Sequence, residues 1–234
     1  MKMASSTTLT LLFFPFLLLT ISHATTFDIV NECSYTVWAA WAAPGNVGGG
    51  QQLNQGQNWT VTVNTSTAAG RIWGRTGCSF DANGNGHCQT GDCGKLACTS
   101  YGSPPNTLAE FAVNQNSPPY YTNRDFIDIS LLQGFNMPMD FRSTSASCSQ
   151  DIQCNADVVG QCPNALKVPG GCDDPCTIFK TAQYCCSSGS SCEPTIYSQF
   201  FKRLCPEAYS YPEDDTTSTS SCPGGTSYRV TFCP

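Results

Sequence analysis

Sixteen cysteines constrain this chain more than any other feature of its sequence. All of them lie between Cys33 and Cys233, behind a leader-like N-terminal segment. An even number of cysteines in an exported chain predicts disulfides, here eight. Spacing leaves their pairing open, because 16 cysteines can be joined in about two million ways. Full pairing leaves no thiol nucleophile, and it favours disulfides over a zinc site for the close pair Cys172 and Cys176.

Residues 1–24 have the pattern of a secretory signal peptide. Lys2 supplies the positive charge, residues 9–19 form the apolar run, and small residues at Ser22 and Ala24 flank the expected cleavage point. No other apolar run is long enough to span a bilayer, and the last residues carry no retention or anchoring motif. The sequence therefore predicts a secreted, extracellular protein that begins at Thr25 and has no transmembrane anchor.

The charge of the chain limits its partners. It has 17 acidic and 11 basic residues, and loss of Lys2 with the signal peptide leaves 10 minus 17, a net charge of −7. This charge argues against nucleic acid and anionic membranes as partners and favours a neutral polyhydroxylated or a cationic ligand. No cofactor is expected, because the glycines at 84–86 lack the lysine and helix of a phosphate loop. His87, the only histidine after the signal peptide, has no partners for a catalytic triad.

Most of the mature sequence has the two-residue alternation of β-strands. Pro138 lies inside one such run, which predicts an edge strand or a bulge there, and the glycines at 48–50 predict a turn. Trp41, which is flanked by alanines, is expected to be the most exposed of the four tryptophans. The predicted strands are residues 27–30, 36–39, 59–63, 71–76, 107–113, 125–131, 135–141 and 228–234.

Two cysteine-rich stretches interrupt these strands, at residues 78–105 and 148–205. Only the second contains helix signals. Asp174 followed by proline predicts a helix that runs from Cys176 to Tyr184. The region 195–204 has apolar residues at i, i+3, i+4 and i+7, which predicts a helix that packs into the core. The fold class is thus mainly β, an antiparallel domain with two disulfide-rich insertions, one of them containing short helices.

Two acidic residues lie within predicted strands. Glu110 falls in the strand at 107–113, and Asp128 lies between Ile127 and Ile129 in the next one. Two close carboxyl groups can act as acid and base on a glycosidic bond, because like charges raise the pKa of one of them. Their separation distinguishes retaining from inverting hydrolysis. Alternatively, they form an ion-paired network with Arg71 that only binds sugar hydroxyls.

Asn58 and Asn64 each begin an Asn-x-Ser/Thr sequence. In an exported chain such asparagines are candidate N-glycosylation sites. Both lie in or beside a predicted strand.

Several segments together resemble the plant thaumatin-like proteins, the fifth group of pathogenesis-related proteins. The resemblance covers essentially the whole mature chain and includes the order of all 16 cysteines. Its segments are residues 33–40 (CSYTVWAA), 86–93 (GHCQTGDC), 104–111 (PPNTLAEF), 134–139 (GFNMPM), 200–206 (FFKRLCP) and 228–234 (YRVTFCP).

This resemblance implies a thaumatin-like molecule in three parts. A flattened β-sandwich or barrel core would comprise residues 25–77, 106–147 and 206–234, with small domains at 78–105 and 148–205. The implied disulfides are Cys33–Cys233, Cys78–Cys88, Cys93–Cys98, Cys148–Cys222, Cys154–Cys205, Cys162–Cys172, Cys176–Cys185 and Cys186–Cys192.

The resemblance also implies an acidic cleft between the core and the 148–205 domain, built in the family from an arginine, a glutamate and three aspartates. Arg71, Glu110, Asp128 and Asp215 match four of these positions. Gln133 occupies the position of the middle aspartate, so the expected cleft has one charge fewer.

By resemblance, the protein is a monomeric, acidic, secreted plant defence protein of the apoplast. Its expected partner is fungal cell-wall β-1,3-glucan, bound in the acidic cleft with antifungal effect. One alternative is a weak endo-β-1,3-glucanase that uses Glu110 and Asp128. Another is a stress-induced protein or enzyme inhibitor without glucan activity.

Overall fold

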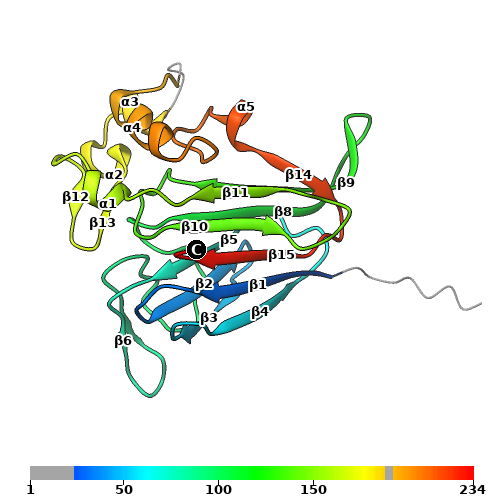
Figure 1. Ribbon diagram of the computed structural model, residues 1–234, viewed down its shortest axis with the longest axis horizontal. Coiled ribbons are helices and arrows are strands. Elements are labelled where there is room, and N and C mark those ends of the chain that lie inside the picture. Colours follow the sequence, from blue (N-terminus) through cyan, green and yellow to red (C-terminus); the bar gives the residue numbers. More distant parts are fainter. Residues whose placement is uncertain (1–23, 188–191) are drawn as a thin grey trace, which may run out of the picture.

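The structure is a computed structural model, and it describes residues 24–187 and 192–234. Two large β-sheets lie face to face. Four of the labelled helices, α1 to α4, gather at one end of the sheets, and α5 lies apart from them near β14 (Figure 1). The mainly β fold with short helices is as predicted. Nearly all of the expected signal peptide lies outside the described residues. Within the described part of the chain, no helix is long and apolar enough to cross a membrane.

The five-stranded sheet has the order β11-β10-β15-β1-β4, and its β1–β15 pair is parallel. The six-stranded sheet has the order β14-β9-β8-β5-β2-β3 and is antiparallel throughout. The first sheet consists of β1 Thr25–Asn31, β4 Asn58–Val63, β10 Met139–Ser143, β11 Asp151–Cys154 and β15 Tyr228–Phe232. The second consists of β2 Val37–Ala43, β3 Val47–Leu53, β5 Gly70–Arg75, β8 Leu108–Ser117, β9 Tyr121–Ser130 and β14 Ser220–Pro223. Two small ribbons pair β6 Ser79–Phe80 with β7 Gly86–His87, and β12 Lys167–Val168 with β13 Gly171–Cys172.

The hydrophobic core fills the space between the two sheets. Phe27 on β1 is fully buried, and its ring lies 4.3 Å from that of Phe111 on β8. The ring of Tyr228 stacks on that of Phe27, with 5.4 Å between the ring centroids. Alternation sends every second residue of each strand inward, so the opposite faces carry the polar side chains.

The described residues include five short helices: α1 Val158–Gln161, α2 Pro175–Phe179, α3 Ala182–Cys185, α4 Ile196–Leu204 and α5 Asp215–Ser218. The stripe predicted at 195–204 is confirmed in α4, where Phe200 and Phe201 are buried. Thr195 caps this helix in a capping box with Ser198.

The single helix predicted from Cys176 to Tyr184 is wrong. Asp174 does cap α2, since its Oδ1 accepts a hydrogen bond from the Thr177 N–H at 2.9 Å. The helix ends at Phe179, because Lys180 adopts a left-handed conformation with φ 54°. A separate helix, α3, then begins at Ala182.

Two predictions about strands are also wrong. β10 begins at Met139, directly after Pro138, and lies between β11 and β15, so it is not an edge strand. The glycines at 48–50 lie within β3, and the turn before it is at Gly45 and Asn46, which both have positive φ. A Cβ on Gly50 would lie 1.8 Å from the Leu96 carbonyl oxygen. The loop closed by the Cys93–Cys98 bridge, here called the disulfide loop, therefore packs directly on this strand.

Further differences concern exposure and short elements. Trp41 is only 9% exposed and belongs to the core, contrary to the expectation that it is the most exposed tryptophan. It points inward with Ala39 and Ala43 because these residues share one face of β2. Between α4 and the last strand, for which no element was predicted, lie α5 and β14.

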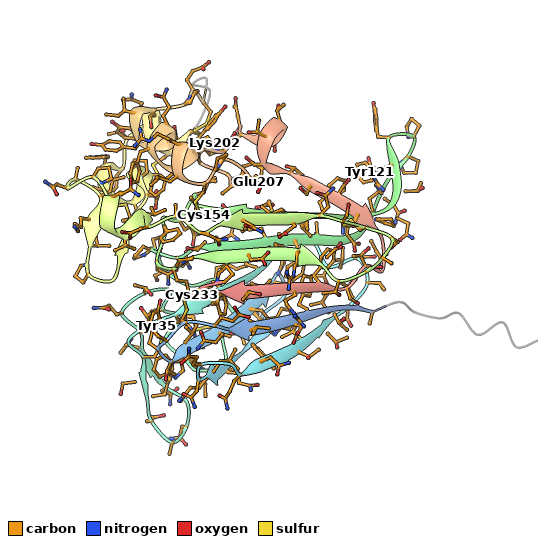
Figure 2. All side chains as sticks on the ribbon, viewed as in Figure 1. Tyr35, Tyr121, Cys154, Lys202, Glu207 and Cys233 are labelled. Atoms are coloured by element: carbon orange, nitrogen blue, oxygen red, sulfur yellow. A yellow bond between two sulfur atoms is a disulfide. The ribbon has the colours of Figure 1, made fainter. Side chains whose placement is uncertain are left out.

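The structure holds eight disulfides, and they join the same pairs that the resemblance implies. Cys33–Cys233 ties the start of the core to the C-terminus, where Figure 2 labels Cys233 near Tyr35. The others are Cys78–Cys88, Cys93–Cys98, Cys148–Cys222, Cys154–Cys205, Cys162–Cys172, Cys176–Cys185 and Cys186–Cys192.

Candidate functional site

Three charged residues form a row across the outer face of the six-stranded sheet. Arg71 on β5 is paired with Glu110 on β8, and Glu110 is paired with Asp128 on β9. Residues paired across adjacent strands share a face and lie within contact distance. We call Arg71, Glu110 and Asp128 the acidic row.

The Arg71 side chain is held from several sides. Its Nε donates to Glu110 Oε1 at 2.6 Å, and both side chains are 24% exposed. The guanidinium lies 4.2 Å from the ring centroid of Tyr101, whose hydroxyl donates to the Ala69 carbonyl at 2.6 Å. These contacts fix one oxygen of Glu110 and leave part of the carboxylate open to solvent.

Gln133 lies beside this ion pair. In the amide orientation that satisfies both of its ends, its oxygen accepts from Arg71 Nη1 at 3.2 Å and its nitrogen donates to Asn106 Oδ1 at 3.1 Å. A neutral amide thus occupies the place where the family resemblance implies a carboxylate. Arg71 therefore has one charged partner on this side, Glu110.

Asp128 is the member of the acidic row with a raised pKa and a buried oxygen. Its Oδ1 is buried and has no hydrogen-bond partner among the described residues. Burial raises the pKa of the Asp128 carboxyl well above its usual range, and the nearby charges of Glu110 and Asp215 raise it further, while Arg71 opposes them. A protonated carboxyl group can donate a hydrogen bond, which an ionised carboxylate cannot.

Tyr209 connects Asp215 to the acidic row. Its backbone N–H donates to the Ile129 carbonyl at 2.8 Å, which places the ring beside the end of β9. Its hydroxyl donates to Asp215 Oδ1 at 2.6 Å and also contacts the Thr219 hydroxyl. Burial, followed by the hydrogen bond to Asp215, raises the pKa of Tyr209.

The structure therefore brings four of the five predicted site residues together and reaches the fifth, the exposed Asp215, through Tyr209. Tyr209 and Tyr101 were not predicted as site residues. No periodicity marks either residue, because both lie in loops. Tyr101 packs on Arg71 of β5, and Tyr209 hydrogen-bonds to the end of β9. The arrangement presents carboxyl, amide and phenol groups on one polar surface, which suits hydrogen bonding to several hydroxyl groups of a ligand.

Other predicted sites lie elsewhere. Asn58 and Asn64 are both exposed, and Asn58 Nδ2 donates to Asp28 Oδ1 at 2.8 Å, so glycosylation at either remains a prediction. The His87 side chain is 88% exposed, with its Nδ1 3.1 Å from Asp92 Oδ2. Cys172 and Cys176 belong to different disulfides. In the described ranges, no group of three or more histidine, cysteine or acidic side chains could hold a metal ion.

A second perturbed carboxyl group, Asp140, lies on the outer face of the other sheet. It is 5% exposed, and its Oδ1 has no hydrogen-bond partner within the described part of the chain. Burial and the neighbouring Asp151 carboxyl raise the pKa of Asp140 to about 7, with a smaller contribution from Glu32 and opposition from Arg142.

This raised pKa predicts a pH-dependent stability. A carboxyl group whose folded-state pKa is raised contributes stability that is complete below about pH 4 and lost as the pH rises through about 7. We expect Asp140→Asn to have a free energy of unfolding close to wild type at about pH 4, and about 2 to 4 kcal/mol higher at about pH 8. Urea denaturation of both proteins across this range is the measurement. If the free energies of unfolding of wild type and Asp140→Asn change with pH in the same way, the raised pKa of Asp140 is contradicted.

Comparisons with known proteins give one family. The model of the Thaumatin family matches residues 31–234. A thaumatin-like protein from Actinidia deliciosa is 54% identical over 235 residues and is aligned over the full length of both chains. Among solved structures, the thaumatin-like xylanase inhibitor TLXI is 25% identical with a TM-score of 0.51, over 89% of this chain and 99% of that one. A β-1,3-glucanase domain from Clostridium beijerinckii has a TM-score of 0.55 at 8% identity, over 90% of this chain and 98% of that one, and so shares the fold alone.

Proposed function

The chain belongs to the thaumatin family, and from this membership we propose that it is an exported plant defence protein that binds neutral β-1,3-glucan at the acidic row. The cell wall of a fungus is the proposed source of the glucan. The family membership and the disulfide-rich fold are consistent with secretion.

The observation that carries the proposal is that Glu110 and Asp128, which are neighbours in the acidic row, differ in their capacity to accept and to donate hydrogen bonds. Glu110 is held by Arg71 and can accept from a sugar hydroxyl, whereas the raised pKa of Asp128 lets it donate. Asp128 Oδ1 has no protein partner in the described ranges, so a ligand hydroxyl would satisfy a buried polar atom. A neutral polysaccharide offers donors and acceptors on every ring, and the net negative charge of the protein does not repel it.

Removing the charge of Glu110 tests this proposal. We expect Glu110→Gln to bind insoluble β-1,3-glucan at least about tenfold more weakly than wild type, because a charge-assisted hydrogen bond is lost and Arg71 is left without its charged partner. Co-sedimentation with the glucan over a range of protein concentrations measures this. Glu32→Gln, the same chemical change at an exposed residue away from the acidic row, serves as the control. Equal retention of all three proteins would refute the acidic row as the binding site.

The same carboxyl groups could hydrolyse the glucan, with Asp128 as the acid and Glu110 as the base or nucleophile. The raised pKa of Asp128 favours this second reading. Reducing ends released from soluble β-1,3-glucan by wild type and Glu110→Gln separate the two readings. Release by wild type alone would indicate a weak glucanase, and equal background from both would leave binding.

Inhibition of a glycoside hydrolase is another candidate function. The similarity to a protein described as a xylanase inhibitor favours it. We expect no inhibition of xylanase, amylase or trypsin if glucan binding is the main activity. Stoichiometric inhibition of one of these enzymes, together with no retention on glucan, would replace the proposed function.

A further inference from the structure

A pocket separate from the acidic row lies between the end of β9 and the helical region. Its volume is about 170 Å³, and it is lined by residues of five chain segments. Leu132 follows β9, Tyr211 belongs to the loop before α5, and Asp174 lies at the start of α2. No member of the acidic row lines it.

Asp174 is the unusual group in this pocket. The residue is only 3% exposed. Its Oδ1 caps α2, but its Oδ2 is buried and has no hydrogen-bond partner among residues 24–187 and 192–234. A buried carboxylate oxygen without a partner costs free energy, so a cationic group that reached the Asp174 carboxylate would be stabilised there.

The charge around this oxygen is negative. Glu193 also lines the pocket, and none of the ion pairs in the described part of the chain includes Asp174 or Glu193. No lysine, arginine or histidine is among the lining residues. Burial raises the pKa of Asp173 to about 6, and the Asp174 charge contributes while a hydrogen bond from the Asp174 backbone N–H opposes it. Asp173 does not line the pocket, but above that pH its carboxylate adds to the negative charge beside Asp174.

The other lining groups suit an organic cation with hydroxyl groups. Tyr184 and Tyr211 provide aromatic rings, which bind both cations and sugar rings. Gln183 and Thr195 provide an amide and a hydroxyl. A cavity of about 150 Å³ holds one benzene ring, and a sugar ring with its substituents is larger, so this pocket has room for no more than one sugar ring.

We propose that this pocket is a second ligand site, which binds one ring of a protonated amino sugar with its ammonium group facing Asp174. The site is independent of glucan binding at the acidic row. It provides a charge-selective contact, because a neutral sugar cannot satisfy the Asp174 carboxylate in the same way.

Glucosamine is the probe that tests this site, with glucose and N-acetylglucosamine as neutral counterparts of the same ring. Near neutral pH, titration followed by NMR or calorimetry should show binding of glucosamine at least tenfold tighter than that of either neutral sugar. Asp174→Asn should remove this preference. Asparagine caps helices as well as aspartate does, so α2 keeps its cap and the variant loses only the charge. Glu110→Gln should bind glucosamine as wild type does.

Three outcomes would overturn the proposal. Equal binding of glucosamine and glucose would remove the role of the ammonium group. Unchanged binding in Asp174→Asn would remove the role of the carboxylate, and loss of binding in Glu110→Gln alone would move the ligand to the acidic row. If Asp174→Asn does not fold, Glu193→Gln, a change at an exposed residue of the rim, should weaken glucosamine binding about threefold, and no change there would also refute the site.

Discussion

Removing the Cys33–Cys233 disulfide is expected to lower the free energy of unfolding by about 4 kcal/mol. This bridge joins residues that are 200 positions apart, so it restricts the unfolded chain more than any of the other seven bridges. The loss of chain entropy grows with the logarithm of loop length, and the remaining bridges already restrict part of the same loop. For a chain of this size the change corresponds to a fall in Tm of about 8 to 16 °C.

The double variant Cys33→Ala with Cys233→Ala leaves no unpaired thiol and is suitable for thermal and urea unfolding. The matched control removes Cys93–Cys98, which spans five positions. Its expected cost is about 2 kcal/mol, because a short loop restricts the unfolded chain less. A control variant as unstable as the Cys33–Cys233 variant would contradict the loop-length explanation.

Replacing Arg75 by leucine is expected to lower the free energy of unfolding by about 4 kcal/mol. Arg75 is fully buried. Its guanidinium donates to the carbonyl oxygens of Trp38 at 3.0 Å and Ala39 at 3.3 Å on β2, and to those of Lys95 at 2.6 Å and Leu96 at 2.7 Å in the disulfide loop. Burial lowers the pKa of Arg75 to about 10, with the charge of Asp92 opposing the shift.

Leucine cannot donate to any of these carbonyls, so the variant loses the contacts that hold residues 93–98 against β2 and β3. Besides lowering the Tm, the substitution should speed up amide hydrogen exchange in residues 78–105. Exchange in the five-stranded sheet should change less. Arg203→Leu is the control, because Arg203 is exposed on α4 and its loss should cost no more than about 0.5 kcal/mol. An Arg75→Leu protein with wild-type Tm would show that the buried guanidinium does not hold the loop.

Strands such as β1, β4, β5, β8, β9 and β15, and the α4 helix, could be predicted because their patterns are local. Alternation along β1 and the spacing of the apolar residues in α4 follow directly from the geometry of strands and helices. The break between α2 and α3 could not be predicted in this way. It depends on a left-handed residue at Lys180, in a segment that the Cys176–Cys185 bridge closes.

The glycines of β3 show the same limit. As a run of glycines, they predict a turn, and only the contact between Gly50 and Leu96 explains why a strand requires them. The exposure predicted for Trp41 and the edge strand predicted at Pro138 were wrong for a similar reason. Burial and edge position are properties of the assembled sheets, and residues far away in the sequence determine them.

For the candidate site, local alternation showed which acidic residues lie on strands, and the family resemblance indicated which residues to group. The tertiary structure decided their chemistry. Cross-strand register set Glu110 between Arg71 and Asp128, and burial raised the pKa of Asp128. Folding of loops onto the sheet brought Tyr101, Gln133 and Tyr209 to the acidic row, and it buried Arg75 and Asp174. A pattern along the chain records periodicity, whereas desolvation and contact depend on what packs against each group, and only the fold contains that information.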